Sequence, residues 1–303
     1  MLLFRLIKRN ILVYCRDRSN IFFSLLSMLI IIGLMVVFLG KMNADSVVNL
    51  LSQYGGERDS ALDRSNAEQL VMLWTLAGIV VVNSITITLS MVGIMVEDEA
   101  QKRLSSFYVA PVSRWVFVFS YVIAAIIMGI IMCTLTVVIG EAYIVSTGGI
   151  MMSFAVMGKV FLYIILNVFT SASMVFLIAN FVHSQSAFGA LSTIIGTLVG
   201  FLAGIYLPIG MLPEKIQNVL KCFPLLHGCS FLRELLTKDI LSTTFAGYPE
   251  ELIKGYREAM GISIVYQGEA IPVTLQVAFL VISGIIFIGL AALLQGKRNV
   301  MSR

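Results

Sequence analysis

The sequence predicts an all-α polytopic membrane protein, and three observations carry this prediction. Of the 303 residues, 58% are hydrophobic and only 13% are charged, whereas about a quarter of the residues in a soluble domain are charged. The mean hydropathy is +0.94. Six apolar segments are long enough to cross a bilayer core, which takes roughly 20 helical residues. These predicted transmembrane helices are residues 21–40, 70–96, 116–140, 155–182, 186–208 and 272–295.

Residues 1–20 precede the first span and have the pattern of an interfacial amphipathic helix. The apolar face would hold Leu3, Phe4, Ile7, Ile11 and Tyr14, and the basic face Arg5, Lys8, Arg9 and Arg16. We expect this helix to lie along the inner leaflet with its basic face toward lipid phosphates or a partner; a simple orientation signal is the alternative. No small-residue cleavage site follows the first apolar run, so we expect a retained anchor.

An even number of spans places both termini on the same side of the membrane, and the basic residues indicate which side. Lys and Arg gather in residues 1–20, in the link 97–115 and in the C-terminal tail. Acidic residues outnumber basic ones in the 41–69 loop, which would lie on the opposite side. Because cytoplasmic loops are enriched in Lys and Arg, we expect cytoplasmic termini in a multi-pass protein of the plasma membrane. The long 209–271 segment would then be extracellular.

The chain after the fifth span reads LPIGMLPEKIQNVLKCFPLLHGCSFLRELL. Apolar residues recur at helical spacing between Pro213 and Pro224, and a second short apolar helix follows. Each helix would be too short to span, so we expect a pair of re-entrant or capping helices between spans five and six. Cys222 and Cys229 flank the turn between them, and they could form a disulfide on that side or remain unpaired.

The motifs of several enzyme classes are absent from this sequence. It has no GxxxxGK[ST] phosphate loop, no GxSxG elbow and no HExxH pair. Two histidines leave little material for a triad, and the four cysteines form no CxxC pair. We therefore expect neither an enzyme nor a metal site, and no cofactor in this chain. A net charge of +4 is too small to indicate nucleic-acid binding.

Ionisable residues are sparse in the middle of the predicted spans. Glu141 and Lys159 lie near span ends, so no residue indicates proton or sodium coupling. Neutral polar residues occupy central positions and are candidates for a translocation pathway: Asn83, Thr86, Thr88, Asn167, Thr170 and Ser171. Hydrogen bonding between helices is the alternative role for these side chains.

Three glycines recur every four residues near the end of the fifth span, at Gly196, Gly200 and Gly204. Small residues at this spacing let two helices approach closely in lipid. We therefore expect a helix-packing face here, used either within the chain or across a dimer.

Four features together resemble the membrane (permease) subunit of ABC type-2 exporters. They are the six spans, the basic amphipathic N-terminus, the link that ends in APVSRW, and the run MLPEKIQNVLKCFPLLHGCSFLREL. The resemblance covers almost the whole chain and implies a single transmembrane domain over residues 1–303. Its most specific part is VAPVSR, which is similar to the family pattern T/S-P-V/I-x-R.

In that family the link after the second span forms a coupling helix that rests on a separate nucleotide-binding subunit. The resemblance implies that three acids, Glu97, Asp98 and Glu99, open this helix. It implies that three apolar residues, Leu104, Phe107 and Tyr108, contact the partner. Pro111 and Arg114 would then turn the chain into the next span. Lys102 and Arg103 replace a Gly-Thr pair of many members and would add charge that an acidic partner groove could use. A solvated loop needed only for orientation is the alternative.

The resemblance implies a permease subunit that exports a compound while separate ATPase subunits hydrolyse ATP. ATP and Mg would bind in those subunits, and a second permease subunit, identical or different, would complete the transporter. We expect an amphipathic or hydrophobic substrate, such as a drug, an antimicrobial peptide or a lipid-like molecule, because neutral polar residues and 16 Met suit an adaptable interior. Alternatives are the export of an ion or a polysaccharide, and a membrane sensor or scaffold without transport.

Overall fold

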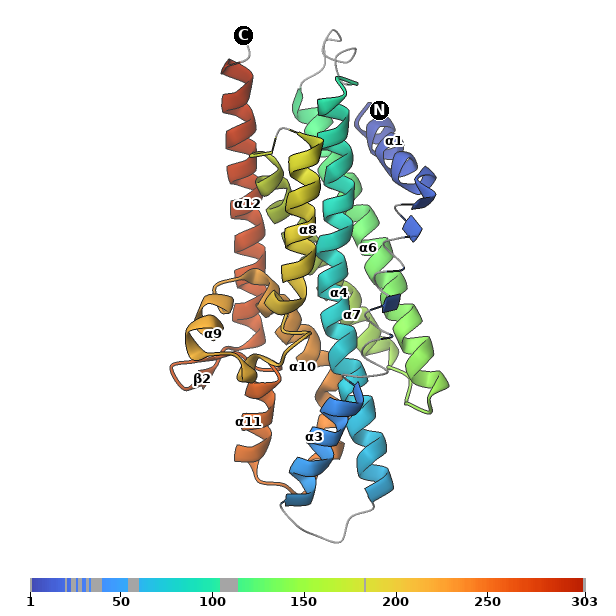
Figure 1. Cartoon of the computed structure of the whole chain (residues 1–303), viewed down its shortest axis with the longest axis vertical. Coiled ribbons are helices and arrows are strands. Elements are labelled where there is room, and N and C mark those ends of the chain that lie inside the picture. The colour runs from blue at the N-terminus through green and yellow to red at the C-terminus, as the bar shows by residue number, and fades with distance from the viewer. Residues whose placement is uncertain are drawn as a thin grey trace.

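Helix α4 (Ser60–Ala100) is the longest element and lies in the middle of the bundle (Figure 1). The computed structural model describes residues 2–19, 21–22, 26, 29–30, 33, 40–53, 60–103, 114–182 and 184–301. Side chains from Leu70 to Val96 in α4 are almost all buried. A helix that is buried on every side needs apolar residues all round rather than on one stripe, which accounts for the sequence of this span.

Four further helices in the described part of the chain are long and apolar enough to cross a membrane. They are α6 (Arg114–Ser146), α7 (Phe154–Ala179), α8 (Gln185–Leu202) and α12 (Val273–Met301). Ser153 and Ser184 cap the N-termini of α7 and α8 by accepting hydrogen bonds from backbone N–H groups. With α4, these helices account for five of the six predicted spans. Most of the other one, residues 21–40, lies outside the described residues.

Helix also occupies much of the 41–69 segment, where the sequence analysis predicts a loop. α3 (Gly40–Gln53) packs against α4, which begins at Ser60 rather than near residue 70. Ala44, Val47 and Leu51 recur at helical spacing and are buried against α4. This apolar stripe is short and interrupted by polar residues, so the hydropathy of the segment alone does not indicate it.

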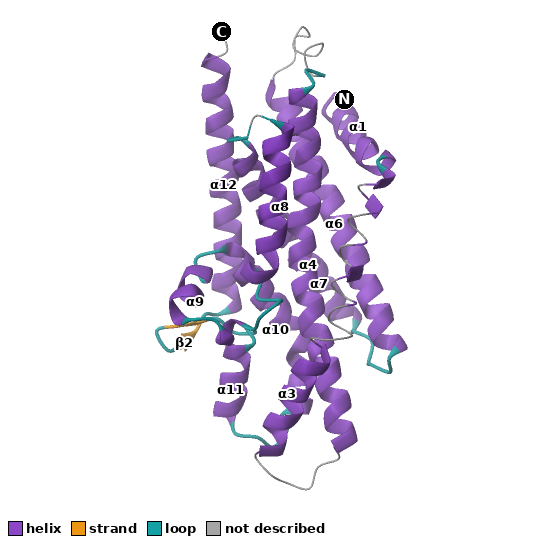
Figure 2. Cartoon of the chain, in the orientation of Figure 1, coloured by secondary structure: helices purple, strands orange, loops and turns teal. Residues whose placement is uncertain are grey.

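Between α8 and α12 the chain forms a short 3-10 turn, three helices and a two-stranded hairpin (Figure 2). These are η2 (Ile209–Met211), α9 (Glu214–Leu220), α10 (Pro224–Thr244), α11 (Glu250–Ala259), and β1 (Val265–Tyr266) paired antiparallel with β2 (Glu269–Ala270). α10 is longer than the predicted short helix and packs against α4, α7 and α12. Pro224 stands in its first turn, where the missing N–H leaves no hydrogen bond unmade.

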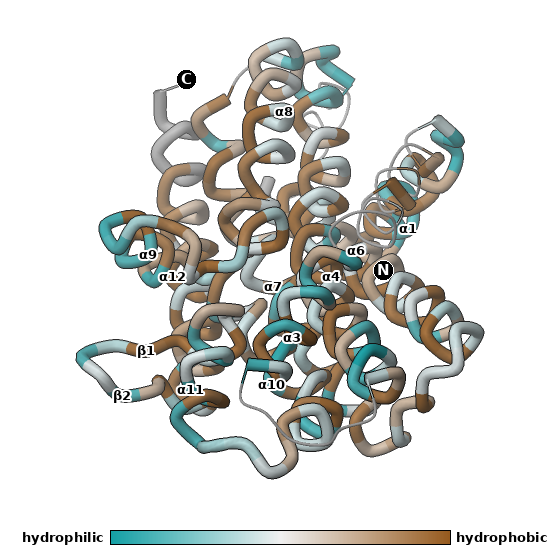
Figure 3. The backbone as a smooth tube through the Cα atoms, turned by 60° about the horizontal axis from the view of Figure 1, so that its bottom comes forward, coloured by the Kyte–Doolittle hydropathy of each residue, from teal (hydrophilic) through white to brown (hydrophobic). Residues whose placement is uncertain are grey.

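The two ends of the bundle differ in what they hold. Helix α1 (Leu2–Arg16), the end of α4, the start of α6 and the end of α12 lie at one end, whereas α3 and α11 lie at the other (Figure 1). Apolar residues dominate the long helices, and hydrophilic residues gather on α9 and on turns (Figure 3). The N-terminal helix and the C-terminal helix end are thus on the same side of the molecule.

Candidate coupling site and translocation pathway

The acids of the predicted coupling segment lie in the last turn of α4. Glu97, Asp98 and Glu99 belong to this helix, which ends at Ala100. The expectation that they open a separate helix is therefore corrected: they close a helix that runs without interruption from the opposite end of the molecule. Acids at a helix C-terminus are disfavoured by the helix dipole, so their position here needs compensating cations.

Asp98 receives that compensation from a cluster of three side chains, Arg9, Arg103 and Tyr121, which we call the Asp98 cluster. The Asp98 carboxylate is 0% exposed. It forms an ion pair with Arg9 and accepts hydrogen bonds from the Tyr121 hydroxyl at 2.6 Å and from Arg103 Nη1 at 3.3 Å. Arg9 also donates to the Tyr121 hydroxyl at 3.1 Å. The cluster thus joins α1, the end of α4 and the start of α6.

Helix α1 is held against the bundle by its polar as well as its apolar residues. Leu6, Asn10 and Tyr14 are buried, and Asn10 Nδ2 donates to Ser120 Oγ at 3.1 Å. The hydrogen bond to Asp98 is the largest of the effects that raise the pKa of Arg9. The apolar and basic faces predicted for this helix therefore match the structure only in part. Arg9 of the basic face points into the protein, whereas Leu3 and Phe4 of the apolar face are exposed.

Lys102 ends α4 in a left-handed backbone conformation. Its φ is +54°, and the Arg103 backbone N–H donates to the Asp98 carbonyl at 3.0 Å. A residue of this conformation followed by such a hydrogen bond is the usual helix stop, and glycine is favoured there because it has no Cβ. The Gly-Thr pair that the sequence analysis noted in other members at these two positions suits this backbone better than Lys102 does.

The predicted coupling segment also includes residues 104–115. Leu104, Phe107, Tyr108 and Pro111 lie outside the described residues, and Arg114 begins α6. Glu99 and Lys102 are exposed next to this part of the chain, whereas Glu97 is half-buried and pairs with Arg103. Asp98 differs from them because no part of its side chain reaches the surface.

The six neutral polar residues predicted for a pathway form hydrogen bonds inside this chain. Asn83 Nδ2 donates to Thr136 Oγ1 at 2.8 Å, and Thr170 Oγ1 donates to the Leu280 carbonyl at 3.1 Å. The others bond in the same way: Ser171 to Ser84 across helices, Asn167 to the Tyr163 and Gly228 carbonyls, and Thr86 and Thr88 to carbonyls of α4. All except Thr86 are buried. These contacts tie α4, α6, α7, α10 and α12 together.

The three glycines of the predicted packing face have different surroundings. A Cβ at Gly200 would lie 2.2 Å from the Tyr206 ring, and Gly204 has φ +62° in the turn that ends α8. These two positions require glycine for packing and for a turn within the chain. Gly196 has no atom within 4 Å of such a Cβ, and it lies on a helix whose Ile194, Leu198 and Phe201 are exposed.

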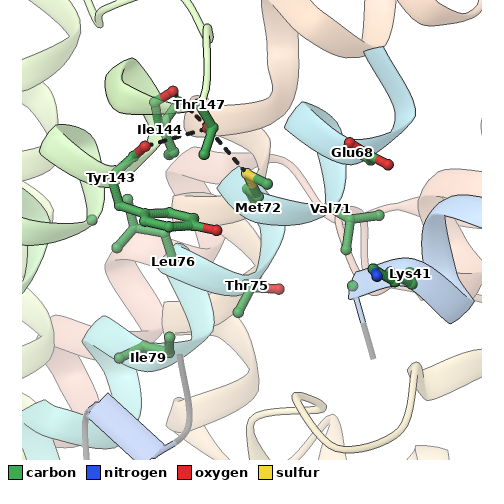
Figure 4. A pocket seen from close by; sticks show the side chains of 12 residues that line it. Lys41, Glu68, Val71, Met72, Thr75, Leu76, Ile79, Tyr143, Ile144 and Thr147 are labelled. Carbon is green, nitrogen blue, oxygen red and sulfur yellow. Dashed lines mark hydrogen bonds between the residues drawn. The ribbon is translucent and has the colours of Figure 1, made fainter. Parts of the chain in front are cut away.

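A pocket of about 260 Å³ lies between α3, α4 and α6 (Figure 4). Its wall is mostly apolar, with Lys41 and Glu68 as the charged lining residues. The Thr75 hydroxyl is buried there with no hydrogen-bond partner in the described part of the chain, while the Thr147 hydroxyl donates to the Tyr143 and Ile144 carbonyls. A second groove, of about 800 Å³, lies between α6 and α7.

The cysteines are separate from one another in the structure. Cys222 is exposed and Cys229 is buried in α10, and both are free thiols, so the disulfide alternative is not realised. No group of three metal-ligating side chains occurs within the described ranges.

Sequence reasoning missed Arg233, which is fully buried in α10. Its Nη1 and Nη2 donate to the Met260 and Gly204 carbonyls at 3.2 and 2.9 Å, and the guanidinium carbon lies 4.1 Å from the centroid of the Trp74 ring. The basic residue within the mostly apolar run FLRELL could have indicated Arg233, because a charge buried in such a run must be compensated. Arg233 fastens the end of α8 and the turn after α11 to α4.

The sequence matches a known protein family. The sequence profile of a family described as ABC-2 type transporter matches residues 1–237 of the 303. No curated protein matches the chain. The membrane-length helices of the structure suit a membrane subunit. The chain belongs to the ABC-2 type transporter family, of whose transporters it is the non-catalytic membrane subunit.

Proposed function

We propose that the chain is the permease subunit of an ATP-driven exporter that moves an amphipathic or hydrophobic compound out of the cell. Separate ATPase subunits bind ATP and Mg, and two permease subunits make the complete transporter. In this proposal both termini and the 97–115 segment are cytoplasmic, and the chain between α8 and α12 faces the exterior. The family supports an ATPase partner.

The Asp98 cluster is the observation that carries the proposal. It lies at the end of α4 and directly precedes the segment on which an ATPase would act. Because α4 is one helix of 41 residues, a displacement of its end is passed along its whole length to α6, α7, α8 and α10, which pack on it. The interfacial helix α1 moves with it, since Arg9 and Asn10 attach α1 to the same place.

The chemistry of the cavities supports this substrate class. Both the pocket in Figure 4 and the groove between α6 and α7 have mostly apolar walls, and apolar walls with a few polar groups suit amphipathic ligands. A hydrated ion or a polysaccharide would suit a lining that is polar throughout, whereas polar residues are a minority in both cavities.

The first prediction tests coupling through Asp98. We expect Asp98→Asn to reduce substrate-stimulated ATP hydrolysis at least about tenfold, because truncating one partner of a buried charge pair costs several kcal/mol. Tyr121→Phe removes the hydrogen bond to Asp98 and the one from Arg9 but leaves the Arg9–Asp98 ion pair, so it should reduce the stimulation only about two- to fivefold. The measurement is ATP hydrolysis by the permease reconstituted with its ATPase, with and without a lipophilic substrate.

Asp45→Asn is the matched control, because Asp45 is an exposed acid on α3 at the other end of the bundle. Each variant must still copurify with the ATPase, which shows that it folds. Unchanged stimulation in Asp98→Asn would contradict the coupling role, and failure of any ATPase to copurify would favour a sensor or scaffold.

A further inference from the structure

A groove between α6 and α7 holds a buried carboxylate that the proposed coupling does not use. The groove has a volume of about 800 Å³, within the range of sites for drug-sized ligands. Glu141 and Thr134 are its polar lining residues. The rest are apolar or glycine: Val137, Val138, Ala142, Val145, Met151, Phe154, Met157, Gly158, Val160, Phe161 and Ile164. We call it the Glu141 groove.

Glu141 is only partly satisfied by the protein. The side chain is 5% exposed, and its Oε1 accepts a hydrogen bond from the Met152 backbone N–H just before α7. Its Oε2 is buried with no hydrogen-bond partner among the described residues, and the same holds for the Thr134 hydroxyl oxygen. A buried carboxylate oxygen without a partner is costly, so this arrangement favours a ligand that supplies positive charge.

Among the described residues, no basic side chain pairs with Glu141. Lys159 is the only basic residue between positions 134 and 164; it is exposed and is not part of the groove lining. An ionisable residue held inside a membrane bundle is by default a functional-site candidate. The outer end of the groove is apolar and open, with Phe154 87% exposed.

We propose that the Glu141 groove binds a free cationic amphiphile, with its ammonium group at Glu141 and its apolar body along α6 and α7. The single negative charge selects a cation, and the apolar walls select a hydrophobic body of matching length. The claim that such a cation is the exported compound rests on the proposed function. The claim that the groove binds such a cation does not depend on ATP hydrolysis.

The experiment uses the full chain with its ATPase in nanodiscs of phosphatidylcholine. The probe is a dodecyl trimethylammonium with a photoreactive diazirine in its tail, and the matched probe is an uncharged dodecyl amide with the same tail. We expect the cation to label peptides within residues 134–164 and to bind about tenfold more tightly than the amide, which corresponds to about 1.4 kcal/mol.

Two variants test the charge of Glu141 and the volume of the groove separately. Glu141→Gln keeps an oxygen for the Met152 N–H and should abolish the preference for the cation. Gly158→Leu adds a side chain where a Cβ meets no atom within 4 Å, so it should fill the groove without strain and weaken both probes about tenfold. Glu214→Gln, at an exposed acid in α9, should change neither. A retained cation preference in Glu141→Gln, or labelling outside α6 and α7, would overturn the proposal.

A lipid headgroup amine offers the same chemistry, so a further arm adds phosphatidylethanolamine to the nanodiscs. Persistent labelling supports a free amphiphile, whereas loss of labelling identifies the occupant as lipid and overturns the proposal. Transport of the cation into proteoliposomes is measured separately. Specific binding without ATP-dependent transport would contradict the proposed function but not this inference. Transport of the cation at an unchanged rate in Glu141→Gln would contradict this inference but not the proposed function.

Discussion

Two buried charged residues in this chain are compensated in different ways. Asp98 is paired with cations from two other segments, Arg9 and Arg103. Arg233 has no acid partner in the part of the chain that the structure describes, and instead it bonds to carbonyl oxygens and packs on Trp74. The carbonyl of Gly204 lies at the C-terminal end of α8, where the helix dipole is negative. Burial accordingly lowers the pKa of Arg233 from its usual value.

Replacing Arg233 should therefore affect stability more than most changes outside the spans. We expect Arg233→Ala to lower the free energy of unfolding by about 3 to 5 kcal/mol, because it leaves the Gly204 carbonyl unpaired and removes the contact with Trp74. Arg257→Ala is the control, since Arg257 forms a partly exposed ion pair with Glu234 worth about 0 to 1 kcal/mol. Thermal unfolding in detergent measures both, and equal losses would contradict the role given to Arg233.

Lys102 provides a second test at the scale of one residue. Its left-handed φ of +54° is strained for a residue with a Cβ by about 1 to 2 kcal/mol. We expect Lys102→Gly to raise the free energy of unfolding by about 1 kcal/mol. Gln101→Gly, one residue earlier in a conformation that does not need glycine, should lower it by about 0.5 to 1 kcal/mol. A loss of stability in both variants, seen in the same unfolding assay, would contradict this assignment of the turn.

At the scale of the element, α8 and α12 are the long helices of the described chain that the rest of the protein covers least, and α8 is the less covered of the two. Phe188, Val199 and Gly200 are its buried residues, and a wide apolar face is left exposed. Gly189 and Gly196 lie seven residues apart, and a Cβ at either would meet nothing within 4 Å. A second permease subunit that packs on this face would come close to the α8 backbone.

Cysteine cross-linking tests this face directly. In a background with Cys15→Ser and Cys222→Ser, we expect Gly196→Cys to form a cross-linked dimer with a short bifunctional maleimide. Val199→Cys should not, because Val199 is buried within its own chain. The readout is the dimer band on a denaturing gel of membranes from cells that produce the transporter. Absence of cross-linking from both Gly196→Cys and Gly189→Cys would place the dimer contact elsewhere.

At the scale of the whole molecule, the sequence was most informative where hydropathy is decisive. Five predicted spans are helices of membrane length, because a long apolar run in lipid must satisfy its backbone hydrogen bonds internally. The ends of helices were less predictable. The extension of α4 to Ser60 depends on a short stripe in α3 that is recognisable only when the two helices pack.

The residue types of the candidate site could be predicted from the sequence, but the contacts between those residues could not. The charge of the 97–99 acids indicated a special segment, yet no pattern shows that Asp98 pairs with Arg9, which lies 89 positions earlier. The polar residues of the spans likewise could not be assigned to a pathway or to packing before their partners were known. Tertiary contacts between distant segments decide such questions, and periodicity does not encode them.

The four native cysteines give a test of the whole arrangement. Cys15 on α1 and Cys222 after α9 are exposed, while Cys133 and Cys229 are buried. Burial also raises the pKa of the Cys229 thiol, which slows its reaction because the thiolate is the nucleophile. If the N-terminal end is cytoplasmic, a membrane-impermeant maleimide added to intact cells should label Cys222 alone. Permeabilised cells should add Cys15, and only denaturation should add the other two.

Single-cysteine variants identify which thiol reacts, and a mass increase of the intact chain measures how many do. Labelling of Cys15 from outside intact cells would invert the proposed orientation, because α1 shares its end of the bundle with the start of α6 and the end of α12 (Figure 1). Labelling of Cys229 in the native protein would instead contradict the packing of α10 against α4, α7 and α12. The two failures are distinct, since the first concerns the side of the membrane and the second concerns the fold that the membrane surrounds.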